Sequence, residues 1–164
     1  MKSGKKSQTV SYGHDIEAAW LTEEAAGIIK NKSLLQQAQQ YAVILAIAAI
    51  DGLDTDGGLW YEYDITKDDL TKEKHWWPQA EAMVGFFNAW QISRDSNYLQ
   101  SAWNSWNFTK KSIRDQEHGE WVWGVHGDNS IMTEQDKAGI WKCPYHNGRA
   151  CIELINRINQ SISA

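Results

Sequence analysis

The chain has 164 residues, of which 42% are hydrophobic and 23% charged, and its formal net charge is -5 with a pI near 5.5. This length allows one domain with a substantial core. The acidic balance argues against nucleic acid or an acidic membrane surface as a partner, because both require a basic face. No apolar run reaches the roughly 18 residues of a membrane span, so we also expect no membrane partner.

The chain begins with a basic segment, MKSGKK, that is not followed by an apolar stretch. This composition is typical of a solvated tail and not of a secretory signal, so we expect residues 1–10 to be a disordered basic tail. The two cysteines, Cys143 and Cys151, do not make a disulfide framework. These features favour a cytoplasmic protein with one folded region at residues 11–164.

Helical periodicity begins directly behind the tail. Apolar residues recur at three- and four-residue steps from His14 to Lys30, which predicts a first helix. After a break at Asn31, the run SLLQQAQQYAVILAIAAI predicts a second, more buried helix. The following DGLDTDGG predicts a turn. Its spacing does not suit a calcium loop, because Gly52 stands where the first ligand belongs and no glutamate closes the loop.

The second half of the chain continues this alternation of helices with short extended segments. LWYEYDI predicts a short strand. Pro78 suits the first turn of a third helix that runs through QAEAMVGFFNAWQIS, and a fourth helix is expected from about Asn97 to Arg114. After an extended GEWVWGV and a polar loop, NGRACIELINRIN predicts a fifth helix. The pattern indicates helical hairpins with short extended connections.

Three junctions between a loop and a helix carry residues suited to proton transfer and sugar binding. These residues are His14, Glu17 and Trp20 at the first junction, Trp76, Trp77 and Glu81 at the second, and Trp141, His146 and Arg149 at the third. Imidazole takes and returns protons near neutral pH, and an indole face stacks on a sugar ring. The sequence therefore predicts one shared pocket for a polyhydroxylated ligand.

The same residues are also compatible with purely structural roles. Asp15 could cap the first helix and leave His14 half-buried, with no role in chemistry. His14 and Glu17, three residues apart, could ligate a metal, but no second such pair accompanies them, so we expect no metal site. Most tryptophans would pack between helices in any case.

Four segments carry a resemblance to a known family: GHDIEAAWLTEEAA, KHWWPQAEAMVGFFNAWQ, GEWVWGV and KAGIWKCPYHNGRACIE. Together they resemble the C-terminal portion of the cellobiose 2-epimerases, which belong to the N-acylglucosamine 2-epimerase superfamily. The string CPYHNGR is the discriminating motif. The resemblance implies an all-α fold, a partial (α/α)6 barrel with roughly the last five of twelve helices. It also implies that the absent portion holds another histidine and an arginine of the site.

The resemblance further implies a reaction, C2 epimerisation that interconverts glucose and mannose at the reducing end of cellobiose. The proton carriers would be His14 and His146, working through a cis-enediolate without cofactor or metal. The implied roles of the other residues are substrate or histidine contact for Glu17, binding near the enediolate oxygen for Arg149, stacking on sugar rings for Trp77 and Trp141, and pocket walls for Trp20, Trp76 and Glu81.

The expected partners are a disaccharide, cellobiose or a related β-linked sugar, and the missing N-terminal half of the barrel. Two alternatives accompany this interpretation. The chain could be a catalytically incomplete fragment or a helical interaction module. It could also belong to an epimerase or isomerase that acts on mannobiose or on a monosaccharide such as mannose.

Overall fold

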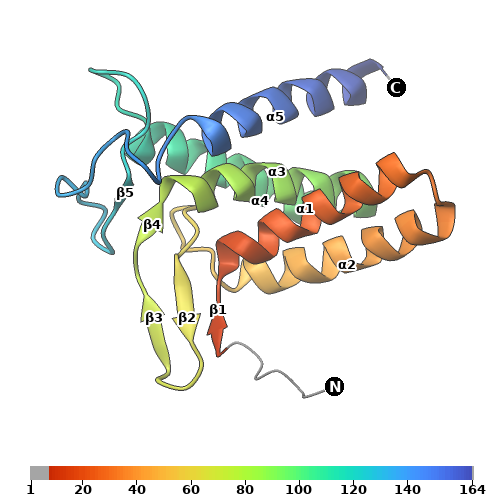
Figure 1. Cartoon of the computed structure of the whole chain (residues 1–164), viewed down its shortest axis with the longest axis horizontal. Coiled ribbons are helices and arrows are strands. Elements are labelled where there is room, and N and C mark those ends of the chain that lie inside the picture. Colours follow the sequence, from red (N-terminus) through yellow and green to blue (C-terminus); the bar gives the residue numbers. More distant parts are fainter. Residues whose placement is uncertain (1–7, 164) are drawn as a thin grey trace.

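The computed structural model describes residues 8–163, which form five α-helices and five short strands (Figure 1). The helices are α1 (Tyr12–Ile29), α2 (Lys32–Ile50), α3 (Trp76–Ser93), α4 (Ser96–Phe108) and α5 (Tyr145–Ser163). A π-helical segment, Thr109–Ile113, continues α4. The five helices expected from the sequence are confirmed, each within a few residues of its predicted bounds.

The strands make two small antiparallel sheets beside the helices. One sheet has the order β1 (Thr9–Val10), β2 (Glu62–Asp64), β3 (Asp69–Thr71), and the other joins β4 (Lys74–His75) to β5 (Gly124–Val125). The expected strand in LWYEYDI is β2. The basic MKSGKK lies outside the described residues. Thr9 and Val10 pair with Asp64 and Tyr63, so the expectation of a tail that reaches residue 10 is wrong, because these two residues complete a sheet.

Three helices, α1, α3 and α5, run side by side in one direction and begin at the end of the molecule that carries the strands and long loops (Figure 1). The helices α2 and α4 return in the opposite direction. The central helix is α3, which packs against α1, α4 and α5 and is buried from Pro78 to Ala89. A side-chain Cβ at Gly85 would lie 2.5 Å from Ile16 Cγ1, so this glycine allows α1 and α3 to approach closely. The N-terminal ends of the three parallel helices therefore face one region.

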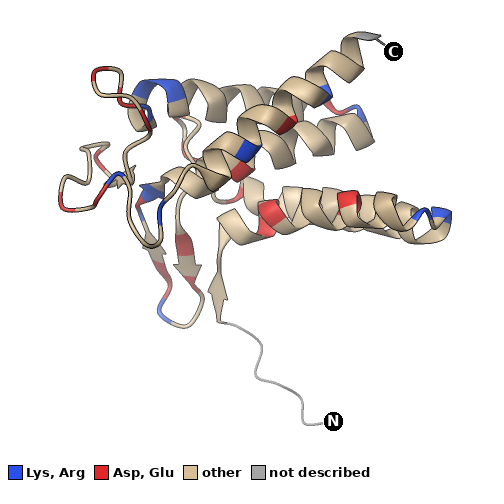
Figure 2. Ribbon diagram, turned by 45° about the horizontal axis from the view of Figure 1, so that its top comes forward, with Lys and Arg blue, Asp and Glu red and all other residues tan. Residues whose placement is uncertain are grey.

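The helix α2 is less buried than the sequence predicts. Its buried residues form a stripe of alanines that packs against α1: Ala38, Ala42, Ala46 and Ala49. Tyr41, Ile44 and Ile47 are exposed, because no element of the described chain covers that face. Beyond Lys32 the helix has no charged residue, whereas charged side chains gather in the loops and strands (Figure 2).

Within the described residues, α2 alone has the length and apolar composition that a membrane crossing requires. Its alanine stripe packs against α1, as in any helical hairpin. The expectation that no membrane is involved stays a prediction.

The loop DGLDTDGG does not have the spacing of a calcium loop, and its aspartates bind the side chain of Lys74. Lys74 is fully buried, and its Nζ lies 2.7 Å from both Asp54 Oδ2 and Asp56 Oδ2. The ammonium also lies 4.1 Å from the centre of the Trp60 ring. An internal ion pair of this kind attaches the loop to β4, directly before α3 begins.

Candidate functional site

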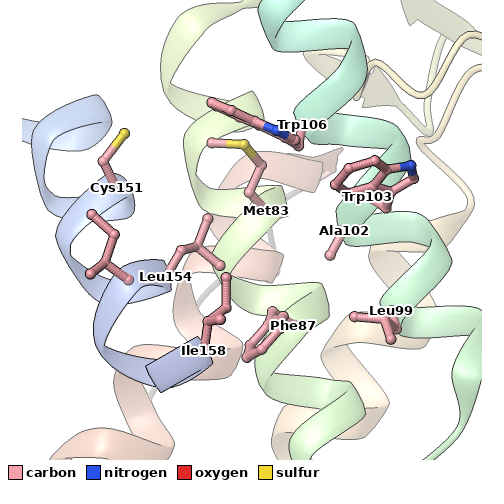
Figure 3. Close-up of a pocket in the computed structure, with 10 residues that line it drawn as sticks. Met83, Phe87, Leu99, Ala102, Trp103, Trp106, Cys151, Leu154 and Ile158 are labelled. Carbon is pink, nitrogen blue, oxygen red and sulfur yellow. The ribbon is translucent and has the colours of Figure 1, made fainter. Parts of the chain in front are cut away.

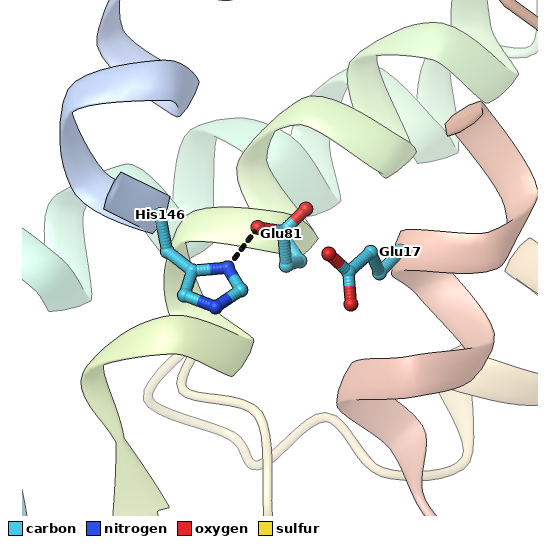
Figure 4. Close-up of side chains that lie close together, drawn as sticks. All are labelled: Glu17, Glu81 and His146. Atoms are coloured by element: carbon cyan, nitrogen blue, oxygen red, sulfur yellow. Dashed lines mark hydrogen bonds and ion pairs between the residues drawn. The ribbon is translucent and has the colours of Figure 1, made fainter. Parts of the chain in front are cut away.

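Six of the predicted residues meet where α1, α3 and α5 begin. His14 and Glu17 come from α1, Trp77 and Glu81 from α3, and His146 and Arg149 from α5. Figure 4 shows Glu81 between His146 and Glu17. Because each residue lies in the first two turns of its helix and the helices are parallel, the three segments converge even though His14 and His146 are far apart in the sequence.

Glu81 is the buried centre of this cluster, with 1% of its surface exposed. Its carboxylate accepts hydrogen bonds from Trp20 Nε1 at 2.9 Å and from Arg149 Nη2 at 2.7 Å, and His146 Nδ1 lies 2.7 Å away. A carboxylate is an acceptor in such contacts, so the imidazole nitrogen is the donor. Neutral His146 therefore carries its proton on Nδ1 and presents the lone pair of Nε2 on its other side.

Arg149 joins the two carboxylates of the cluster. Its Nη2 donates to Glu17 Oε1 at 2.8 Å as well as to Glu81, and its Nη1 donates to Tyr145 Oη at 2.6 Å. Burial alone would lower the pKa of Arg149, but the hydrogen bonds with Glu17 and Glu81 raise it above its ordinary value. The guanidinium is thus a permanent cation that offsets one of the two negative charges of buried Glu81 and partly buried Glu17.

The contacts of Arg149 also bear on whether the cluster could bind a metal ion. Ligand atoms of Glu17, Glu81 and His146 all lie within 4.8 Å of one another, a spacing that suits a metal ion. Arg149 already occupies the position between the two carboxylates, and a second cation there would be repelled. The donor set therefore fits a metal ion poorly.

The Trp77 ring contacts the rings of both histidines. Its centre is 4.7 Å from the ring centre of His14 and 5.7 Å from that of His146. His14 is exposed, and its Nδ1 lies 2.7 Å from Ser11 Oγ. A Cβ at Gly13 would lie 2.6 Å from Trp77 Cη2, so only glycine leaves room for the indole at this place. Both histidines thus use Nδ1 for protein contacts, and both lie next to one half-buried indole.

The capping interpretation of this segment is wrong. The N-cap of α1 is Ser11, which makes no side-chain capping hydrogen bond, and Asp15 lies inside the helix. His14 is exposed instead of half-buried.

Four predicted site residues have environments that differ from an open sugar pocket. Trp20, Trp76 and Glu81 are buried and do not form an accessible surface. Trp20 contacts the cluster through Glu81, whereas Trp76 packs against Trp123 and Lys142. Trp141 is 82% exposed, and in residues 8–163 the structure shows no ring contact for it. It therefore lies outside the cluster, because its loop extends into solvent beside α5.

A second group of side chains, which no sequence pattern indicated, anchors the start of α5. Glu120 Oε1 accepts hydrogen bonds from Lys142 Nζ at 3.1 Å and Asn147 Nδ2 at 2.9 Å. Burial raises the pKa of Glu120, but hydrogen bonds from the Trp121 N–H, Lys142 and Asn147 together lower it below its ordinary value. Lys142 is fully buried under the Trp76 ring. The pairing of residues this far apart left no periodic signal in the sequence, whereas the contact of Arg149 with Tyr145, four residues earlier, was predictable from helical spacing.

Comparison with known proteins assigns the family. The family model for N-acylglucosamine 2-epimerase matches residues 3–150 of the chain. The chain belongs to the N-acylglucosamine 2-epimerase family.

Individual members of the N-acylglucosamine 2-epimerase family are similar over most of the chain. The cellobiose 2-epimerase of Bacteroides fragilis is 45% identical over 150 residues, which are 92% of this chain and 38% of that protein. A crystal structure of a sugar epimerase from a ruminal bacterium superposes with a TM-score of 0.86 at 40% identity, covering 91% of this chain and 38% of that one. The cellobiose 2-epimerase structure from Spirochaeta thermophila gives a TM-score of 0.86 at 35% identity, covering 94% and 39%.

These matches also establish how much of the fold is present. The chain spans 38% of the length of the relatives it matches first, so its five helices are a partial (α/α)6 barrel. The expected fold class and the resemblance to cellobiose 2-epimerases are both confirmed.

Proposed function

We propose that this chain is the part of a sugar 2-epimerase that carries both proton-transferring histidines, His14 and His146. The reaction would invert C2 of the reducing-end glucose of cellobiose or a related β-linked disaccharide. The supporting observation is that both imidazoles lie next to the ring of Trp77, at centre-to-centre distances of 4.7 Å for His14 and 5.7 Å for His146. An inversion requires proton transfer on two faces of one carbon, and an indole that lies near two bases is a suitable platform for the sugar.

The reaction follows from the properties of the two imidazoles. Once the sugar ring is open, the C1 aldehyde acidifies the C2 hydrogen, and Nε2 of one neutral histidine removes this proton to give a cis-enediolate. Rotation about the C2–C3 bond presents the other face to the second histidine, which returns a proton to C2. One C–H bond breaks and one forms, and no electrons are gained or lost, so the chemistry balances without a cofactor.

The residues around the histidines have positioning and electrostatic roles in this proposal. Glu81 holds His146 in the tautomer with a free Nε2, which is the form a general base requires. Arg149 supplies positive charge beside the developing enediolate oxygen, and Glu17, bound to Arg149 through Oε1, offers its second oxygen to a sugar hydroxyl. Trp141 joins the sugar site only if its loop moves over the cluster when substrate binds.

One observation favours the alternative of a catalytically incomplete fragment. The chain spans 38% of the length of the cellobiose 2-epimerase of Bacteroides fragilis, so most of a barrel lies outside it. Activity is therefore expected only when the remaining part of a barrel is supplied.

Deuterium exchange tests the proposal directly. The chain is combined with the part of the Bacteroides fragilis cellobiose 2-epimerase outside the matched region, and cellobiose is incubated in deuterated water. Exchange at C2 should occur with the original chain and with His118→Ala, an exposed histidine outside the cluster. It should be lost with His14→Ala and with His146→Ala. Exchange that persists in both variants would refute the assignment, and absence of exchange with the original chain favours the fragment alternative.

A further inference from the structure

Ser11 occupies the N-cap of α1, but its side chain does not cap the helix. Its backbone is extended, with φ -109° and ψ 99°, and its carbonyl accepts a hydrogen bond from the Asp15 N–H at 3.0 Å. A serine at this position ordinarily accepts a further hydrogen bond with its hydroxyl, and the side chains of Asn31 and Asp95 do so at the starts of α2 and α4. The Ser11 hydroxyl makes no such bond and lies instead 2.7 Å from His14 Nδ1. This hydroxyl therefore serves the imidazole and not the helix.

The backbone on both sides of Ser11 is fixed by other parts of the fold. Directly before it, β1 pairs with β2, with Val10 opposite Tyr63. Directly after it, Tyr12 and Gly13 are buried in the first turn of α1. The hydroxyl is thus held in a defined place, whereas an exposed side chain that nothing holds changes rotamer within nanoseconds.

Within residues 8–163, Ser11 is the one polar partner of the His14 ring. At the same ring nitrogen His146 has the buried carboxylate of Glu81, whereas the other neighbour of His14 is the Trp77 ring, with 4.7 Å between the ring centres. The cavity of about 460 Å³ between α3, α4 and α5 supplies no partner, because its lining side chains are apolar or weakly polar and none belongs to the histidine cluster (Figure 3). The orientation of His14 therefore depends on one hydroxyl and one indole.

We propose that Ser11 is a positioning residue for His14: its hydroxyl accepts a hydrogen bond from Nδ1–H and so holds the neutral imidazole in the tautomer whose Nε2 is free. The hydrogen bond at one imidazole nitrogen determines which nitrogen carries the proton. A hydroxyl has two lone pairs and one hydrogen, so it accepts from Nδ1 and still donates to water. This role rests on the proposed reaction, in which His14 Nε2 takes a proton from C2 or returns one. The contact persists through that transfer, because Nδ1 carries a hydrogen in both the neutral and the protonated ring.

Nitrogen-15 NMR of the imidazole nitrogens tests the tautomer. Spectra of the labelled chain are recorded at about pH 8, above the ordinary imidazole pKa of about 6.5, and the His14 signals are identified by their loss in His14→Ala. We expect His14 to carry its proton on Nδ1 in the original chain and in Ser11→Thr, which keeps the hydroxyl. In Ser11→Ala the proton should be shared between the two nitrogens, because no acceptor selects one of them.

Exchange at C2 of cellobiose in the completed barrel tests the consequence for the reaction. Ser11→Ala should lower kcat at least about tenfold and change KM less than about twofold, because the hydroxyl acts on the base and not on sugar binding. Ser11→Thr should keep kcat within about threefold of the original value.

The matched control is Asn31→Ala, which removes the side chain that does cap a helix. It should lower the urea unfolding midpoint by about 0.5 M and leave the His14 tautomer and kcat unchanged. Ser11→Ala should shift this midpoint less than half as far, because no capping hydrogen bond is lost. The two variants thus separate helix capping from positioning of the imidazole.

Three results would overturn the role of Ser11. The first is a His14 proton on Nε2 in the original chain, and the second is an unchanged tautomer in Ser11→Ala. The third is an altered tautomer in Ser11→Ala with the original kcat. The NMR measurement needs no turnover, so it decides whether Ser11 holds the tautomer even when the original chain shows no exchange, a result that would count against the proposed reaction alone.

Discussion

Replacing Glu81 with glutamine tests the buried centre of the cluster. Glu81→Gln keeps the shape of the side chain but removes its charge and turns one acceptor into a donor. All three of its partners, Trp20, His146 and Arg149, are themselves donors. At least one of them must lose its hydrogen bond, whichever way the amide is turned.

The size of the effect follows from burial. Breaking a buried ion pair by removing one partner costs about 3–5 kcal/mol. Arg149 keeps its bond to Glu17 at 2.8 Å, which offsets part of the loss and places the expected cost near 3 kcal/mol. With a urea m-value of about 2 kcal/mol/M, the unfolding midpoint should fall by about 1.5 M.

Urea unfolding followed by tryptophan fluorescence measures this shift. The matched control is Glu153→Gln, which removes a partly exposed carboxylate that lies 3.3 Å from Arg157 on the same helix. Arg157 keeps its bonds to Asn88 and Gln91, so the control should cost less than about 1 kcal/mol. Nitrogen-15 NMR should also show that His146 loses its preference for a proton on Nδ1. An effect of Glu81→Gln no larger than that of the control, with an unchanged tautomer, would refute the reasoning.

Three further predictions concern the supports of the site. Gly13→Ala should displace the Trp77 ring, because its Cβ would lie 2.6 Å from the indole, so C2 exchange in the completed barrel should fall at least about tenfold while circular dichroism stays unchanged. Glu120→Gln should weaken the attachment of α5, since Lys142 is fully buried and loses its carboxylate partner, and amide hydrogen exchange in the first turn of α5 should accelerate; unaltered exchange would contradict this role. Burial lowers the pKa of His75 below 6.5 although Glu73 opposes the shift, so the unfolded chain binds the proton first and the free energy of unfolding should decrease as the pH falls below about 6.5. In His75→Gln this decrease should be smaller, as urea titrations at pH 7.5 and 5.5 would show; equal decreases in both proteins would rule out His75 as the cause.

Hydrophobic periodicity and local motifs were sufficient to predict most of the helices and the segments that meet at the cluster. Steps of three and four residues placed α1, α4 and α5, and Asn31 was a correct indication of a helix start, since its side chain accepts a hydrogen bond from the Leu34 N–H. The crowding of acid–base and aromatic residues at three helix starts predicted which segments meet. These features are local, because a helix determines by itself which of its residues share a face.

Exposure was the property that the sequence could not determine. The apolar run of α2 predicts burial, yet Ile44 is exposed because covering it depends on an element from elsewhere. Glu81 and Trp77 lie four residues apart on α3, but one is a buried acceptor and the other a half-buried platform. The helix α3 is covered on nearly every side, so its sequence has no separate polar and apolar faces from which its orientation could be predicted.

The sequence by itself thus determined the positions of the helices, the helix starts that carry His14 and His146, and the family that their motifs resemble. The tertiary structure alone decided that Glu81 binds both Arg149 and His146, that Trp77 contacts both histidines, and that Trp141 lies apart. The physical reason is that hydrogen bonds and burial depend on which helices lie side by side, and that arrangement comes from packing over distances of many tens of residues in the chain.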